Sequence, residues 1–543
     1  MLKRTLGILL AVILIASMVA CSGTPTATTA PTGAATPTAG AIDWRAPFAT
    51  TVVIKAAYPE ITNAKFAEGE DYNNNLWTKM WKERFNVEVQ ADWVSIEYDV
   101  KLNLAIASKT LPDAFQANTV QFNQLLAAGM LADLTSAYND YASPEFKKMQ
   151  EKTWDIMETA MSGDKIYGMP RLNYGYETST MHLWLRKDWA DADAITDEMT
   201  STITGFEAVM NGFKTKHAAK YGIMEDKNLN VFFQLAPAFH AYPQIWVDGP
   251  DGKIVYGATL PETKVALAKW AEWYKAGLVR EDFATLDNSA MFQDAFKGNV
   301  GAFAQQNWAG WQVGKDMVVN QGDGTYFVSY PLPVVDDKKL MFPLQFANDG
   351  YNCVRAGYET PEALIKLIDN YVDVLDISLG EGTMTLEQVL PFNTNDMHHV
   401  TGPFKVLFQH YNDIKAVVAA NATGVEKFPS GNATLFYNEI QKWLKDKDLV
   451  GLGRYLQMGY DKSSLSRAIS HVDNDQLMKS KIWGSTPQAV VDYGSTLDSL
   501  LVEGYTKIIM GVEPIEYYDT LIAAWKTAGG DAVTAEVNTM YGK

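Results

Sequence analysis

The residues from Lys297 to Trp311, KGNVGAFAQQNWAGW, combine side-chain types that could bind a sugar. The pattern predicts a turn, then a short buried strand over residues 300–304, then a loop that carries Asn307, Trp308 and Trp311. An indole offers a flat apolar face to a pyranose ring, and an amide offers both donors and acceptors to hydroxyl groups. We therefore expect a sugar-binding site here. The alternative, that both tryptophans belong to the core, stays open.

Other polar and aromatic residues extend this prediction along the chain. The further candidates are Tyr174 and Trp246 for stacking, Asp113, Asn348, Asp349 and Asn75 for hydroxyl groups, and Arg171 for the carboxylate of an acidic sugar. Two alternatives remain open. Asp113 could instead serve as a turn or cap residue, and Arg171 could be an ordinary surface arginine.

The elements that must position these residues begin with alternating strands and helices. Strands are predicted over residues 51–57 and 87–93, and helices over residues 73–85, 99–108 and 122–128. This order is typical of a parallel α/β sheet. Because ligands bind outside the carboxyl ends of such strands, Tyr58, Asn73–Asn75, Asp113 and Gln116 are expected near a cleft.

A second group of elements follows residue 250. Asp251 and Gly252 predict a hairpin turn, and Pro261 is suited to the first position of a helix, which Gly277 would end. In that helix Trp270, Trp273 and Tyr274 are interpreted as core residues. From about residue 381 the chain is predicted to be largely helical.

The N-terminus carries an export signal, predicted over residues 1–20. Lys3 and Arg4 precede an apolar run over residues 6–15, which is too short to span a membrane. The segment ending at Cys21 resembles a bacterial lipobox. That resemblance implies a lipid on Cys21, which would anchor the protein on the outer face of the cell membrane without crossing it. An ordinary cleaved signal is the alternative. Residues 21–43, rich in Thr, Pro and Ala, are predicted to be a disordered linker.

Composition and motifs exclude several functions. The 543 residues include 46 basic and 64 acidic side chains, a net charge of −18, which argues against nucleic acid as a partner. The chain has two cysteines, Cys21 and Cys353, which are too few for a zinc ribbon. Cys353 is expected to be buried. The GxSxG, HExxH, P-loop and GxGxxG patterns are absent. His398, His399 and His410 could form a metal site, although surface or capping roles are favoured.

Several stretches resemble a known family. They are SKTLPD at residues 108–113, DKIYGMP at 164–170, LWLRKDW at 183–189, the run from Asp251 to Val279, and EGYTKIIMG at 503–511. All are similar to segments of the extracellular solute-binding proteins of ABC transporters, family 1. The resemblance implies an α/β, two-lobed, periplasmic-binding-protein-like fold of type II, with a hinge between the lobes and a helix-rich C-terminal part. Lobe 1 would comprise residues 44–178 and 341–380, and lobe 2 residues 179–340 and 381–543.

The same resemblance implies a function. The protein would capture an oligosaccharide or sugar derivative between its lobes and deliver it to the membrane subunits of an ABC permease. It would act as a monomer, without catalysis, cofactor or metal. The basic segment over residues 214–221 lacks the oxygen ligands that calcium requires. A secreted glycoside hydrolase and a peptide-binding protein of the same fold remain as alternatives.

Overall fold

The computed structural model describes residues 42–542 except 61–65, 67, 152, 173–174, 379–405, 420–427 and 429–430. The chain divides into two compact units, residues 1–42 and residues 43–543. The predicted signal peptide, Cys21 and nearly all of the predicted linker lie outside the described residues. The second unit holds all the described strands and helices.

The first sheet has five strands in the order β2-β1-β3-β13-β6. Their bounds are β1 (Val52–Pro59), β2 (Val87–Ser95), β3 (Ala114–Ala117), β6 (Met169–Leu172) and β13 (Asn348–Val354). The strand β1 pairs in parallel with β2 and β3, which confirms the predicted parallel order. In contrast, β13 returns from far along the chain and pairs antiparallel with β3 and β6.

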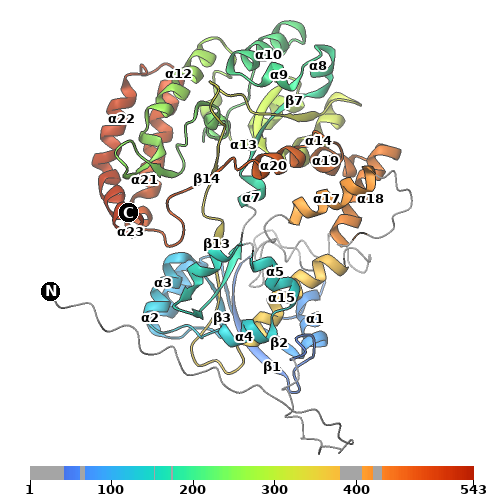
Figure 1. The fold of residues 1–543 in the computed structure, drawn as a ribbon, viewed down its shortest axis with the longest axis vertical. Helices are drawn as coiled ribbons and strands as arrows, with labels where there is room; N and C mark the ends of the chain where they lie inside the picture. Colours follow the sequence, from blue (N-terminus) through green and yellow to red (C-terminus); the bar gives the residue numbers. More distant parts are fainter. Residues whose placement is uncertain are drawn as a thin grey trace, which may run out of the picture. The chain divides into compact units, whose positions relative to one another are not determined.

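Helices cover both faces of this sheet (Figure 1). They are α1 (Leu76–Phe85), α2 (Tyr98–Ser108), α3 (Thr119–Ala127) and α15 (Glu362–Ser378). Successive strand residues point to opposite faces. Accordingly, Ala114 packs in one cluster with Trp77 and Trp81 of α1, whereas Phe115 packs in another with Phe122 of α3. The predicted apolar face of α1 is therefore confirmed, and Cys353 is fully buried beside Phe115, as expected.

The second sheet is antiparallel and has the strand order β10-β7-β11. It comprises β7 (Met181–Arg186), β10 (Ala302–Gln306) and β11 (Phe327–Tyr330), and α10 (Ile203–Lys216) and α12 (Pro261–Lys275) pack around it in the largest apolar cluster. The helix α12 begins at Pro261, as predicted. Trp270 and Trp273 are almost completely buried, so their interpretation as core residues is confirmed.

A hairpin and three helices complete the part of the fold that matters for the site. The strands β8 (Trp246–Asp248) and β9 (Ile254–Tyr256) are antiparallel, and Gly252 takes a positive φ of 77° in the predicted turn. The helices are α21 (Gln488–Ile509), α22 (Tyr517–Trp525) and α23 (Asp531–Tyr541). The side chain of Asn538 accepts from the Ile254 N–H at 2.9 Å and donates to its carbonyl at 2.7 Å. This pair of bonds fixes the hairpin against α23.

The remaining elements connect these parts. They are α4 (Thr135–Tyr141), α5 (Pro144–Glu151), α6 (Trp154–Met157), β4 (Met161–Ser162), β5 (Lys165–Ile166), α7 (Gly175–Thr178), α8 (Lys187–Ala192), α9 (Asp197–Thr200), α11 (Asn230–Leu235), α13 (Asn288–Phe296), β12 (Phe342–Leu344), α17 (Val406–Ala419), α18 (Gly431–Asp446), α19 (Leu449–Met458), α20 (Ser464–Asp473) and β14 (Leu477–Lys479). The expected lobe boundaries stay a prediction. The first sheet takes its strands from residues 52–172 and 348–354, and the second from residues 181–330.

One prediction at the second sheet is wrong. The residues after β10 do not form a loop, because Ala309 begins the helix α14 (Ala309–Gln321), and the strand itself lies two residues later than predicted. Gly310 and Gly314 obscured the helical pattern in the sequence. A methyl group at either glycine would meet Leu456 of α19, so both are small because two helices approach closely there.

Candidate functional site

Three hollows adjoin one another and share lining residues. The first, which we call the amide hollow, has a volume of about 670 Å³. Thr119, Asn348 and Thr486 also line the second, the aromatic hollow, of about 330 Å³. Gln244, Tyr256, Gln345 and Asp498 are common to the aromatic hollow and the third, the inner hollow, of about 280 Å³. The three hollows together form the candidate binding cleft.

The amide hollow lies at the carboxyl end of β3, where ligands of α/β sheets bind. Asn118 follows β3 and caps α3, accepting from the Gln121 N–H at 3.0 Å, and the Gln121 side chain accepts from the Asn118 N–H at 3.1 Å. The amide of Gln121 also donates to Asn103 on α2 at 3.0 Å. Asn348 and Asp349 of β13 line the same hollow. Amide groups held by such contacts present fixed donors and acceptors to a ligand.

Three aromatic rings line the aromatic hollow. The rings of Tyr256 and Trp525 are stacked, with centroids 5.7 Å apart and planes 11° apart. Trp246, across the hairpin from Tyr256, lies 5.2 Å from that ring at 40°. Gln244 and Gln345 are exposed to solvent at the same hollow. Apolar ring surface beside exposed amides is the combination that recognises a sugar ring and its hydroxyl groups.

The hydroxyl of Tyr256 donates a hydrogen bond to Asp498 on α21, with an O···O distance of 3.4 Å. Burial raises the pKa of the Tyr256 hydroxyl far above its ordinary value, and the nearby Asp498 carboxylate raises it further. Partial burial also raises the pKa of Asp498, while the Tyr256 hydrogen bond opposes that change. Tyr256 therefore remains a neutral donor throughout the physiological pH range.

The cleft contains three of the predicted site residues. Trp246 lines the aromatic hollow, Asn348 lines the aromatic and amide hollows, and Asp349 lines the amide hollow. Arg171, on the neighbouring strand β6, donates to the backbone carbonyl of Asp349 at 3.4 Å. Tyr174 lies outside the described residues. The binding roles of these residues stay predictions, although their positions are compatible with them.

The predicted site residues Asn307, Trp308 and Trp311 lie outside the three hollows. Asn307 is 1% exposed and accepts from the amide of Gln457 on α19 at 3.0 Å. The indole of Trp311 donates to the same Gln457 at 3.2 Å, and the Arg454 guanidinium lies 4.6 Å from its ring centroid. Trp308 donates to the Gln306 side chain. Instead of lining the three hollows, Asn307 and Trp311 contact Gln457 of α19.

Asp113 and Asn75 also lie away from the cleft. Asp113 was expected near a cleft at the carboxyl ends of the strands, but β3 begins at Ala114, so Asp113 sits at the amino end of that strand. Its carboxylate accepts from the Lys55 N–H at 2.9 Å and pairs with Arg355 at 2.8 Å. Asn75 caps α1 by accepting from the backbone of Trp77 and Thr78. Both side chains thus have structural partners.

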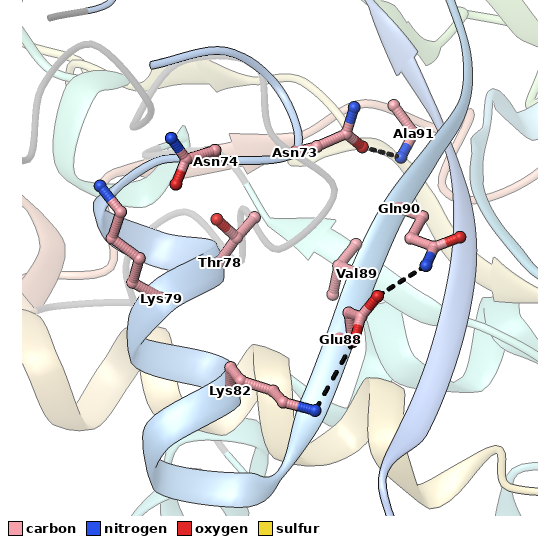
Figure 2. A pocket seen from close by; sticks show the side chains of 9 residues that line it. All are labelled: Asn73, Asn74, Thr78, Lys79, Lys82, Glu88, Val89, Gln90 and Ala91. Atoms are coloured by element: carbon pink, nitrogen blue, oxygen red, sulfur yellow. Dashed lines mark hydrogen bonds and ion pairs between the residues drawn. The ribbon is translucent and has the colours of Figure 1, made fainter. Parts of the chain in front are cut away.

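A separate hollow of about 560 Å³ lies between α1 and β2. Figure 2 shows Asn73 joined to the backbone of Ala91, and Glu88 joined to Gln90 and Lys82. Asn73 accepts from the Ala91 N–H at 2.7 Å, and Glu88 accepts from Gln90 at 2.7 Å and lies 3.7 Å from Lys82. None of the described residues that line this hollow is aromatic, so they offer no ring on which a sugar could stack.

Sequence reasoning missed Gln244, Tyr256, Gln345 and Asp498. A signal existed for Tyr256, because it lies opposite Trp246 in a hairpin whose turn was predicted. Thr119 could have been found as well, since it comes just after the strand end at Ala117. Nothing in the sequence distinguishes Asp498 from the other acidic residues of its helix.

The described residues include no group of three His, Cys, Asp or Glu side chains that could hold a metal ion. His398 and His399 lie outside them, and His410 is buried beside Phe436. Within the same part of the chain, none of the helices has the length and apolar character of a membrane span.

Solved structures share this architecture. The alginate-binding protein AlgQ2, determined without calcium ion, is 16% identical, covers 92% of this chain and 99% of its own, and has a TM-score of 0.57. An HMO-binding solute-binding protein associated with an ABC transporter, from Bifidobacterium longum infantis ATCC 15697, is 12% identical over 90% of this chain and 98% of its own, also with a TM-score of 0.57. The chain therefore has the two-lobed fold of the solute-binding proteins, and the predicted fold class is confirmed.

The profile of the family described as "Bacterial extracellular solute-binding protein" matches residues 77–363. The chain belongs to this family, and the resemblance seen in the sequence is confirmed. Lipoprotein LipO of Bacillus subtilis (strain 168) is 20% identical over 482 residues, which cover 84% of this chain and 86% of that protein. The family and these neighbours in fold are binding proteins, not enzymes.

Proposed function

We propose that this protein captures an oligosaccharide in the cleft formed by the amide, aromatic and inner hollows and delivers it to the membrane subunits of an ABC permease. The three hollows adjoin, so their combined length suits several linked sugar rings better than one. Membership of the solute-binding family supports delivery to a permease.

The single observation that carries the proposal is the aromatic hollow. The ring of Tyr256 is partly exposed beside the exposed amides of Gln244 and Gln345, and the largely buried rings of Trp246 and Trp525 also line the hollow. Apolar C–H faces of a sugar pack against such rings, while its hydroxyl groups exchange hydrogen bonds with water for hydrogen bonds with amides. This surface is suited to binding and release without chemical change.

The relatives support the same class of ligand and location. As their names state, AlgQ2 binds alginate and the Bifidobacterium protein binds HMO. LipO is a lipoprotein, which supports a lipid on Cys21 of this chain and an anchored position on the outer face of the membrane. A monomer would suffice for these roles.

A thermal-shift screen of the purified full chain against neutral oligosaccharides, oligouronates and short peptides tests the proposal. A ligand at a hundred times its dissociation constant adds about 2.7 kcal/mol to the free energy of unfolding. We expect an oligosaccharide to raise the melting temperature, and chromatography of the mixture to return the sugar intact.

The alternatives give different results in the same experiment. Consumption of the sugar would indicate a glycoside hydrolase. A shift produced only by peptides would indicate a peptide-binding protein of the same fold. Either outcome would overturn the proposed function.

A further inference from the structure

The charged side chains of the cleft all have one sign. Among the described residues that line the three hollows, the charged groups are Asp349 and Asp498, and there is no lysine, arginine or histidine. Both residues have solvent-exposed surface, and the carboxylate of Asp498 is partly buried. The other polar lining groups are neutral amides and hydroxyls, which serve hydroxyl groups of a ligand as donors and as acceptors.

The cations next to the lining segments are engaged with other groups. Lys479 and Lys481 flank the lining residue Ser480, but their ammonium groups lie 2.6 Å from Asp155 and 2.5 Å from Asp248. Arg171 donates to the backbone carbonyl of Asp349. Recognition of a carboxylate normally uses a guanidinium or ammonium group that faces the ligand, often in a two-bond arrangement. The described residues place no such group on the cleft wall.

We infer that the ligand of this cleft is an uncharged oligosaccharide and that the cleft rejects oligouronates. The inference rests on the proposed function and specifies its substrate class. A uronate would bring a carboxylate toward Asp349 and Asp498, where like charges repel, and it would leave water without gaining a charged partner. A neutral sugar of the same linkage meets neither obstacle. Similarity in fold to an alginate-binding protein at 16% identity therefore does not extend to an acidic ligand.

Titration calorimetry of the purified full chain with matched pairs provides the test. Each pair consists of a neutral oligosaccharide and the oligouronate of the same length and linkage, such as β-1,4-linked manno-oligosaccharides and β-1,4-linked oligomannuronates. We expect a neutral member to bind at least tenfold more tightly than its uronate partner. The difference should shrink in 0.5 M salt because salt screens the repulsion between exposed charges.

Variants identify the groups responsible. The double substitution Asp349→Asn and Asp498→Asn removes both carboxylates with little change in shape. It should therefore strengthen oligouronate binding and reduce the difference in affinity between the neutral sugar and the uronate. Asp492→Asn is the matched control, because Asp492 is an exposed residue of the same helix that does not line the cleft, and it should change neither affinity.

The outcomes separate this inference from the function on which it rests. Oligouronate binding equal to or tighter than neutral binding, especially if Arg171→Gln abolishes it, would overturn the inference and leave the proposed function standing. If neither class of sugar binds, both are overturned.

Discussion

The side-chain amide of Gln457 donates a hydrogen bond to Asn307 Oδ1 at 3.0 Å, and so joins the end of β10 to the helix α19. The carbonyl oxygen of the same side chain accepts from Trp311 at 3.2 Å and from Arg454 at 2.8 Å. Arg454 in turn pairs with Glu439 at 3.1 Å. This partly buried network uses the amide and the indole that looked suited to a sugar, and it joins α14 to α19.

Substitution of the two tryptophans should separate binding from packing. Trp246→Ala removes ring surface from the aromatic hollow and should weaken oligosaccharide binding at least tenfold, about 1.4 kcal/mol or more. Trp311→Ala should lower stability but leave the dissociation constant within about twofold. Calorimetry on both variants checks this. If Trp311→Ala lost affinity and Trp246→Ala did not, the ligand would bind at the end of β10 and not in the cleft.

A methyl group at Gly453 should destabilise the protein. Its Cβ would lie 2.6 Å from the Trp311 ring and 3.1 Å from the Trp311 Cα, so α14 and α19 would have to separate. We expect Gly453→Ala to lower the free energy of unfolding by about 1–3 kcal/mol in urea titrations. Gly212→Ala in α10 is the control. Its nearest neighbour would be 3.7 Å away, so the better helix propensity of alanine should raise stability by up to about 1 kcal/mol. Equal effects at the two glycines would contradict the close helix contact.

Asp113 should prove structural. Asp113→Ala removes the acceptor for the Lys55 N–H and the partner of Arg355, and we expect a loss of about 1–2 kcal/mol in stability. Sugar affinity should stay unchanged, because Asp113 lies at the amino end of β3 and the cleft is at the carboxyl end. A variant of normal stability that no longer binds sugar would show that Asp113 contacts the ligand.

His410 should lower stability as the pH falls from 7 to 5, whereas Glu225, whose pKa burial raises to about 8, acts in the opposite direction. Burial lowers the pKa of His410 to about 4, and the positive Arg454 adds to this effect. In the unfolded chain the pKa is about 6.5, so below that value the unfolded state takes up a proton that the folded state does not. Between pH 7 and pH 5, His410 is expected to lower the free energy of unfolding by about 2 kcal/mol. Burial also lowers the pKa of His182 and His471, which act in the same direction.

Urea unfolding of the wild type and of His410→Gln at both pH values isolates this contribution. The variant cannot take up the proton, so its stability should fall less over the same interval. Identical pH dependence in the two proteins would mean that His410 does not control it.

The predicted lipid anchor has a direct test in cells. Cys21→Ser removes the thiol to which the acyl chains would be attached, so the variant should appear in the soluble extracytoplasmic fraction. The wild type should sediment with membranes and dissolve in detergent. Retention of the serine variant on membranes would contradict anchoring through Cys21.

The fold was predictable because its signals are local. The spacing of Trp77 and Trp81 marks the buried face of α1, Pro261 marks the start of α12, and Asp251 with Gly252 marks the hairpin. Each of these features depends on residues close together in the sequence. The helix α14 was missed because Gly310 and Gly314 face a partner that lies far away in the chain.

The site was only partly predictable for the same reason. Trp246, Asn348 and Asp349 were predicted and line the candidate cleft, but Tyr256 and Asp498 also line it and come from a hairpin and from a helix more than 200 residues apart. An amide that ends a strand looks the same in the sequence whether it faces a ligand or a helix. Asn307 faces Gln457, and no periodicity within its own segment could have indicated that.

A crystal structure of the complex with the oligosaccharide found in the screen would test the central claim most directly. We predict sugar rings against Trp246, Tyr256 and Trp525, with hydroxyl groups bonded to Gln244, Gln345 and Asn348. A sugar bound instead at Trp308 and Trp311, or in the hollow between α1 and β2, would contradict it.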